Sequence, residues 1–201
     1  MWRPALLLLD RKGYVGAMAS VAQTRLLTAE EFLQIDFGPN LKAELDNGVV
    51  HMMAGGTREH ARVQANLIGF LRQRLRGSGC RPYGSDMGVR AHDRSVRYPD
   101  VTIDCGGSND DERDLVLSNP RVVIEVLSPS TRDYDLRSKR EDYRAMSSVD
   151  TIAFIDPDAE TLIIHQRYDG GWNEALPSDT ADLHLPALGI TIPHTEIFAR
   201  D

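Results

Sequence analysis

The spacing of apolar residues along the chain predicts two long helices and one short one. In residues 57–76 the apolar side chains recur every three or four positions, which places them on one stripe of a helix. Residues 132–146 follow a run of hydroxyl residues that can cap a second helix. Nearer the start of the chain, Thr28 and Glu31 precede apolar residues at the spacing of a capping box, which predicts a short helix.

Short apolar or alternating runs separated by Gly, Asp, Asn and Ser predict strands. These runs cover residues 43–45, 49–53, 80–83, 87–91, 97–105, 121–127, 151–155, 161–168 and 183–185, with shorter strands near Trp172 and at 190–192. The turn at Asn47-Gly48 makes the first two runs a hairpin, and a turn at residues 156–158 makes another. Residues 106–119 are polar and acidic, which predicts a loop. The pattern is therefore a mixture of helices and strands, with no internal repeat.

The length of 201 residues suits one domain with a full hydrophobic core and is short for two. Hydrophobic residues make up 41% and charged residues 26%, which excludes a disordered or collagen-like protein. We expect residues 23–201 to form a single domain and residues 1–22 to be a disordered extension. Because Met18 is an alternative start, whether residues 1–17 belong to the native protein stays open.

The apolar run nearest the N-terminus is too short for a signal peptide or a membrane span. Four leucines at positions 6–9 are followed at once by three charged residues. We therefore expect a cytoplasmic protein without membrane contact. Two cysteines, Cys80 and Cys105, lie far apart and fit no metal-binding spacing, so we predict two free thiols in a reducing cytosol.

The charge balance opposes binding to a polyanion, because 23 Lys and Arg face 30 Asp and Glu, a formal net charge of −7. Nucleic-acid binding would then need a local basic face or bound divalent cations. The predicted helix over residues 57–76 carries such a concentration of positive charge, at Arg58, Arg62, Arg72, Arg74 and Arg76. Two interpretations stand side by side for these arginines: a solvated outer face and a surface that faces phosphates.

Three chemically unlike features follow one another between residues 98 and 143. Asp100 begins a strand after Pro99, Glu125 lies inside an apolar run, and Lys139 follows on the next helix. Strand-borne carboxylates that hold a metal ion and a lysine that positions water are the minimum set for metal-assisted hydrolysis of a phosphodiester. A carboxylate within an apolar strand is costly unless it is paired or metal-bound, which makes Glu125 the strongest candidate.

Each of these residues also has an ordinary structural interpretation. Glu125 can face solvent on a half-buried strand, and Asp100 can be a turn residue after Pro99. Lys139 can form a solvated pair with Asp135, four positions earlier on the helix. The grouping of the residues, rather than any one of them, favours a site.

Three strings in this part of the chain resemble the Uma-two family of restriction endonucleases, a branch of the PD-(D/E)XK nuclease superfamily. They are Y-P-D-V-T-I-D, V-V-I-E-V-L-S-P-S-T-R-D-Y-D-L-R-S-K-R-E-D-Y and I-A-F-I-D-P. Further matches are T-A-E-E-F-L, E-L-D-N-G-V-V-H-M-M and His60, so that the resemblance covers residues 26–198. It implies an α/β (α+β) fold with a restriction-endonuclease-like core, a central mixed β-sheet flanked by helices.

The resemblance also implies roles for particular residues. Asp100 and Glu125 match the acids that bind Mg2+ or Mn2+, and the backbone carbonyl of Val126 is a further ligand. Glu44 matches an acid from the N-terminal region that binds or orients a second metal or its water. Leu127 stands two positions after Glu125, where the superfamily has lysine, and Lys139 on the helix takes that role.

Three accessory residues complete the expected site. Asp135 would hold the ammonium group of Lys139, and Tyr143 would pack against it or form a hydrogen bond nearby. His60 lies on the apolar stripe of its helix, where a satisfied buried histidine and a residue of the site are both open.

The sequence thus supports two functional hypotheses. The first is a Mg2+-dependent endonuclease that hydrolyses phosphodiester bonds in DNA, as a homodimer. The second is a catalytically inactive nuclease fold that serves as a binding or assembly module. The choice between DNA and RNA, the number of metals and the biological role stay open at this stage.

Overall fold

The computed structural model describes residues 25–106, 111, 113–117, 119–129 and 131–200. The expected disorder of residues 1–22 lies outside these residues, as do residues 107–110, 112 and 118 of the expected acidic loop. The helical elements among them are α1 (Ala29–Leu33), α2 (Arg58–Arg74), α3 (Arg132–Tyr134), the π-helix η1 (Asp135–Lys139), α4 (Arg140–Ala145), the 3-10 helix η2 (Pro186–Leu188) and α5 (His194–Ile197). The predicted capping box of α1 is present, with Thr28 and Glu31 each satisfying a backbone N–H of the other.

A five-stranded sheet carries the N-terminal part of the fold. Its order is β2-β1-β5-β4-β7, with β1 (Ala43–Asp46), β2 (Val49–Met52), β4 (Gly88–His92), β5 (Ser95–Arg97) and β7 (Val116–Leu117). The predicted hairpin of β1 and β2 is confirmed, and its turn residues Asn47 and Gly48 both have positive φ, which asparagine and glycine tolerate best. This sheet and α1 share one apolar cluster around Phe32, Leu45 and Val96.

A six-stranded sheet forms the larger part of the molecule. Its order is β11-β10-β9-β8-β6-β3, with β3 (Arg81–Gly84), β6 (Val101–Asp104), β8 (Pro120–Val126), β9 (Thr151–Asp156), β10 (Thr161–Tyr168) and β11 (Gly171–Glu174). β8 and β9 run parallel and the other neighbours run antiparallel, so the sheet is mixed. A small hairpin of β12 (Leu183–Leu185) and β13 (Ile190–Ile192) packs on the same core.

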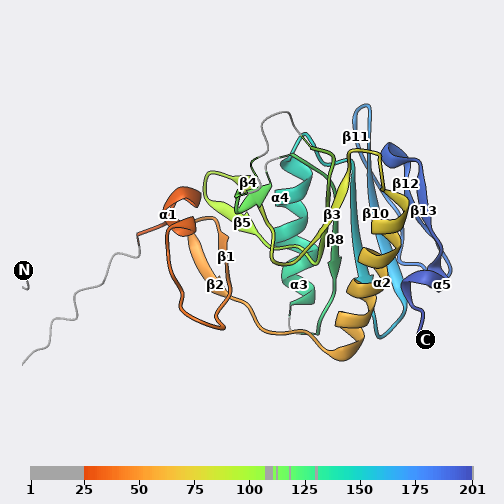
Figure 1. Ribbon diagram of the computed structural model, residues 1–201, viewed down its shortest axis with the longest axis horizontal. Coiled ribbons are helices and arrows are strands. Elements are labelled where there is room, and N and C mark those ends of the chain that lie inside the picture. Colours follow the sequence, from red (N-terminus) through yellow and green to blue (C-terminus); the bar gives the residue numbers. More distant parts are fainter. Residues whose placement is uncertain (1–24, 107–110, 112, 118, 130, 201) are drawn as a thin grey trace, which may run out of the picture.

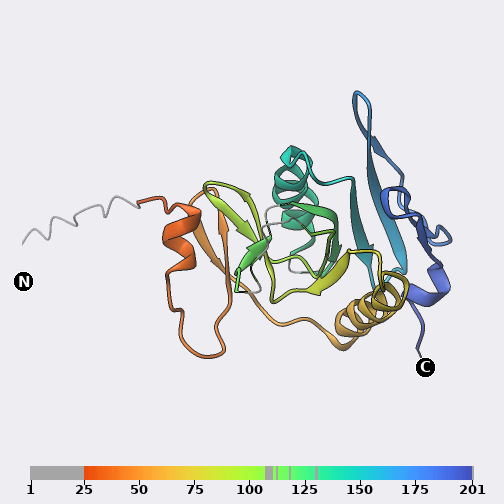
Figure 2. The ribbon, with the colours of Figure 1, turned by 45° about the horizontal axis from the view of Figure 1, so that its top comes forward.

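Helices cover both faces of the six-stranded sheet, as Figures 1 and 2 show. Leu67 and Leu71 of α2 pack with Ile124 of β8 on one face. Tyr143 of α4 packs with Val123 and Ile152 on the other. The expected α+β class, with a central mixed sheet flanked by helices, is confirmed. No helix in the described ranges combines the length and the apolar character needed to cross a membrane.

The prediction of a single strand over residues 97–105 is wrong. It is two strands, β5 and β6, which belong to different sheets. Pro99 lies between them, and a proline has no N–H to donate to a neighbouring strand. The chain therefore crosses from one sheet to the other at residues 98–100, and this crossing carries Asp100.

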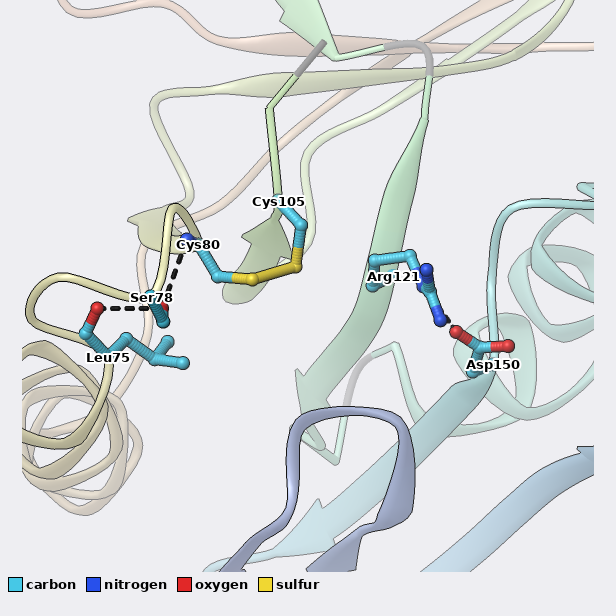
Figure 3. Close-up of a disulfide and its surroundings, with 6 residues drawn as sticks. All are labelled: Leu75, Ser78, Cys80, Cys105, Arg121 and Asp150. Carbon is cyan, nitrogen blue, oxygen red and sulfur yellow. Dashed lines mark hydrogen bonds and ion pairs between the residues drawn. A yellow bond between two sulfur atoms is a disulfide. The ribbon is translucent and has the colours of Figure 1, made fainter.

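The prediction of two free thiols is also wrong, because Cys80 and Cys105 form a disulfide (Figure 3). β3 and β6 are antiparallel, with Arg81 opposite Asp104. The two cysteines are the next residues outward from this pair, on facing chains. Nothing in the spacing of the cysteines along the sequence reveals a pairing that strand register produces.

Candidate active site

The two sheets meet at a pocket of about 700 Å3. β1 of the five-stranded sheet contributes Glu44, and β8 of the six-stranded sheet contributes Glu125. The crossing between the sheets adds Asp100, and η1 adds Asp135 and Lys139. His60, near the start of α2, lines the same pocket. All the acidic and basic residues expected to form the site thus lie around one cavity.

Lys139 is the centre of the cluster. Its Nζ atom lies 3.1 Å from a carboxylate oxygen of Glu44 and 3.2 Å from one of Glu125. A third carboxylate oxygen, from Asp135, is also 3.2 Å away. Burial lowers the pKa of this ammonium group, but the three carboxylates outweigh it and hold the pKa well above its ordinary value. Lys139 is therefore a buried, permanently charged group, and its side chain reaches the strand-borne acids from the helix.

Glu125 is buried in β8 with only 2% of its surface exposed, so the interpretation in which it faces solvent is wrong. The hydroxyl of Tyr143 donates a 2.6 Å hydrogen bond to the same carboxylate oxygen that faces Lys139. Burial raises the pKa of Glu125 to about 8, since nearby Asp135, Asp100 and Glu44 add to the effect and Lys139 only partly offsets it. The cluster thus holds more negative charge than its lysine neutralises.

Asp100 is tied to both neighbouring elements rather than lying in a free turn. Its carboxylate accepts a 2.8 Å hydrogen bond from the backbone N–H of Val126 and lies 3.2 Å from Nε2 of His60. Gln64 of α2 donates to the backbone carbonyl of Asp100 at 2.8 Å. The hydrogen bond to Asp100 raises the pKa of His60, and burial offsets this only in part. His60 is thus positioned against a residue of the site.

Two further carboxylates contact Lys139: Glu44 from β1 and Asp135 from the same π-helix, η1. Glu44, almost fully buried on β1, accepts a 2.9 Å hydrogen bond from the backbone N–H of Tyr98. Asp135 accepts a 2.7 Å hydrogen bond from the Thr131 hydroxyl through one oxygen. Its other oxygen faces the Lys139 ammonium group at 3.2 Å, and burial raises the pKa of the carboxyl group. Both carboxylates are held by their own elements and directed at the same ammonium group.

Arg97 is a structural residue that the sequence patterns did not reveal. Its side chain is fully buried, and it donates hydrogen bonds to Asp142 of α4 at 2.7 Å and to Asp46 of β1 at 2.6 Å. It also donates to the Ser138 hydroxyl, next to Lys139 on η1, at 3.1 Å. The available signal was an arginine at the end of an apolar strand. Arg97 joins the hairpin that carries Glu44 to the helix that carries Lys139.

The donor chemistry of the pocket fits a hard divalent cation. Mg2+ in proteins is held by one or two carboxylates and several waters, and the excess negative charge around Glu125 suits it. In the described part of the chain, no three His, Cys, Asp or Glu side chains are already arranged to hold a metal. Asp100, Glu125 and the Val126 carbonyl are thus chemically suitable ligands that would have to be completed by water.

The fold of this chain is similar to that of a solved structure. A crystal structure from Anabaena variabilis, described as "a putative nuclease belonging to DUF820", superimposes with a TM-score of 0.69 over 86% of this chain and 98% of that one, at 15% sequence identity. The two proteins therefore share a fold.

The chain belongs to the Uma2 family, described as "Putative restriction endonuclease", whose profile matches residues 29–194. The Synechocystis protein sll1609 is 30% identical over 141 residues, 69% of this chain and 80% of that protein. Another Synechocystis protein, slr1290, is 27% identical over 167 residues, 82% and 87% of the two chains. The expected family is confirmed, and it supports a nuclease at the level of general class.

Proposed function

We propose that this protein is a metal-dependent endonuclease that hydrolyses phosphodiester bonds in DNA. The observation that carries the proposal is the position of the Lys139 ammonium group, within 3.2 Å of Glu44, Glu125 and Asp135 at a pocket between two sheets. Support comes from the nuclease description of the family and from the nuclease description of the Anabaena protein that shares the fold.

Asp100, Glu125 and the carbonyl of Val126 would hold Mg2+ or Mn2+, which offsets charge on the phosphate when bound. Glu44 would orient a second metal or its water. Lys139 acts as a positive hydrogen-bond donor that orients the attacking water and stabilises charge on the phosphate, because its raised pKa makes it a poor base. Asp135 keeps the ammonium group in place, Tyr143 fixes Glu125, and His60 fixes Asp100.

Plasmid nicking tests the catalytic roles. We expect the purified protein to nick supercoiled DNA with Mg2+ or Mn2+, and Lys139→Met or Asp100→Asn to lower the rate by about 100-fold or more. Methionine keeps the length of the buried lysine chain, and circular dichroism checks that each variant is folded. Arg137→Met, at an exposed position two residues away, is the matched control and keeps the activity. Equal nicking by all four proteins would indicate a contaminating nuclease and contradict the proposal.

Calorimetry with Mn2+ separates the proposed enzyme from an inactive binding or assembly module. The enzyme should bind Mn2+, and Glu125→Gln should abolish binding by removing a charged ligand. Absence of binding in the wild type would favour the module. The homodimer stays a prediction, for which light scattering on the purified protein is the measurement.

A further inference from the structure

We propose that the outer face of α2 is a binding surface for the phosphate backbone of nucleic acid, extending from the pocket along the helix. This inference rests on the proposed function, because the bound polymer would be its substrate. The face consists of the exposed residues that follow one another at helical spacing: Arg58, Ala61, Ala65, Gly69, Arg72 and, just past the helix, Arg76. Arg74 is exposed beside this stripe.

The arginines of this face are not used to hold the protein together. In the part of the chain that the structure describes, no ion pair or hydrogen bond involves the guanidinium group of Arg58, Arg72, Arg74 or Arg76. Arg62, on the side of the helix, differs: it pairs with Glu59 and donates to the carbonyl oxygens of Phe198 and Ala199. Arg74 lies over the Phe70 ring, 5.1 Å from its centroid. Arg58, Arg72 and Arg76 are thus available to a ligand, whereas Arg62 is structural.

This face is a local exception to the charge of the chain. The only acidic residue within α2 is Glu59, which Arg62 neutralises, while the chain as a whole has a formal net charge of −7. Arginines on a helix that has no unpaired acidic residue of its own attract phosphates, and arginine's planar group can bind a phosphate with two hydrogen bonds. Charge complementarity therefore selects a polyanion as the partner.

The middle of the face allows a polymer to lie close to the helix. Ala61 and Ala65 have short side chains, and a Cβ atom added at Gly69 would meet no other atom within 4 Å. The stripe between the arginines also lacks the large apolar side chains that insert into a lipid surface. A nucleic-acid backbone therefore fits this face better than a membrane does.

The face begins at the candidate active site. Ala61 and Gln64 line the pocket with His60, and α2 continues from there for the rest of its 17 residues, a total helix length of about 25 Å. Since the phosphates of one strand rise about 3.4 Å per nucleotide, the helix matches about seven nucleotides. α2 lies on the outside of the six-stranded sheet, where a polymer can reach it (Figures 1 and 2).

The far end of the face is fixed to the sheet. The Ser78 hydroxyl donates to the carbonyl of Leu75 at 2.8 Å and accepts from the backbone N–H of Cys80 at 3.1 Å. The disulfide then joins Cys80 to Cys105, beyond the end of β6 (Figure 3). Arg72 and Arg76 therefore keep a defined position relative to the pocket.

Binding measured without cleavage tests this surface. We would follow the fluorescence anisotropy of a labelled DNA duplex of about 20 base pairs in EDTA, at several salt concentrations between roughly 50 and 200 mM. Removing two phosphate contacts in the double variant R72Q/R76Q should weaken binding by about tenfold and reduce the slope of log K against log salt by about 2. Glutamine retains helix propensity, and thermal melting checks the fold.

The matched control is R94Q/R137Q, which removes the same charge from two exposed arginines outside α2. It should bind like the wild type, as the proposal requires. If R72Q/R76Q keeps the wild-type affinity and salt slope, the proposed binding surface on α2 is contradicted. The endonuclease proposal would still stand, because nicking is measured separately. Equally weakened DNA binding in both double variants would show a general charge effect and would also contradict the proposed surface. A wild type that binds neither DNA nor RNA duplex at low salt would do the same.

Discussion

At the scale of single residues, the site is a set of charges that are costly apart and tolerable together. Glu44, Glu125 and Lys139 are all nearly buried, and each would be strongly destabilising without its partners. Three carboxylates share one ammonium group, so the neutralisation is incomplete. Burial is the largest cause of the raised pKa of Glu125, and the neighbouring carboxylates add to it.

The first prediction concerns stability against pH. The pKa of Glu125 is about 8 in the folded protein, against an ordinary 4.5, so between these values the folded state retains a proton that the unfolded state has lost. The free energy of unfolding should therefore fall as pH rises through this window. Glu125→Gln cannot titrate and should flatten the profile. Urea denaturation between about pH 5 and 8 measures this.

The comparison of wild type with Glu125→Gln isolates one carboxyl group, because His60 and the other acids are present in both. Glu196→Gln, at an exposed position, should keep the wild-type profile. A Glu125→Gln profile as steep as that of the wild type would contradict the assignment.

At the scale of elements, short interruptions place the functional side chains. Residues 132–145 are helical, as predicted, but the helix is not a continuous α-helix. Its middle is the π-helix η1, flanked by α3 and α4. π-helical turns are rare and are often found at functional sites. Here the turn buries both Asp135 and Lys139 against the acids of the strands. The crossing at Pro99 similarly places Asp100 between two sheets.

The second prediction concerns the disulfide that joins the ends of β3 and β6. Its cysteines are 25 residues apart, and closing a loop of that length in the unfolded chain stabilises the folded state by about 3 kcal/mol. A reducing agent should lower the free energy of unfolding by about this amount. Cys80→Ser should have the lower stability already and show no response to reductant. An identical urea midpoint of the wild type with and without reductant would count against the bond.

At the scale of the whole molecule, the site exists because two sheets are held in one relative position. Glu44 comes from one sheet and Glu125 from the other, and Lys139 bridges them. Arg97 supports the same junction, since it binds Asp46 of the hairpin and Asp142 of α4. The catalytic proposal therefore depends on a network that extends beyond the residues expected to contact substrate.

The third prediction concerns this network. Arg97→Met should destabilise the protein by about 3 to 5 kcal/mol, because it leaves Asp46 and Asp142 without their buried partner. Arg97→Lys should recover only part of the loss, since one ammonium cannot reproduce the guanidinium's several directed hydrogen bonds. Thermal and urea denaturation are the measurements.

Arg94→Met, on the exposed turn between β4 and β5, is the control and should change stability by no more than about 0.5 kcal/mol. A loss for Arg97→Met that is as small as for this control would show that the two sheets are held together by other contacts.

Local chemistry made much of the fold predictable. The capping box of α1, the Asn-Gly hairpin and the apolar stripe of α2 each depend on neighbouring residues, and all three are present. Glu125 was recognisable because a carboxylate in an apolar strand needs a partner. β7 was missed, since its two residues pair in parallel with the distant β4 and have little pattern of their own.

The sequence by itself determined the family, the fold class and the identity of the residues around the pocket, because these follow from local patterns and from ordered motifs. Only the tertiary structure decided that Lys139 reaches Glu44 and Glu125, that Arg97 is buried between the hairpin and α4, and that Cys80 meets Cys105. Strand register and the angle between sheets set these contacts. Both arise from the packing of segments far apart in the chain, which no local pattern records.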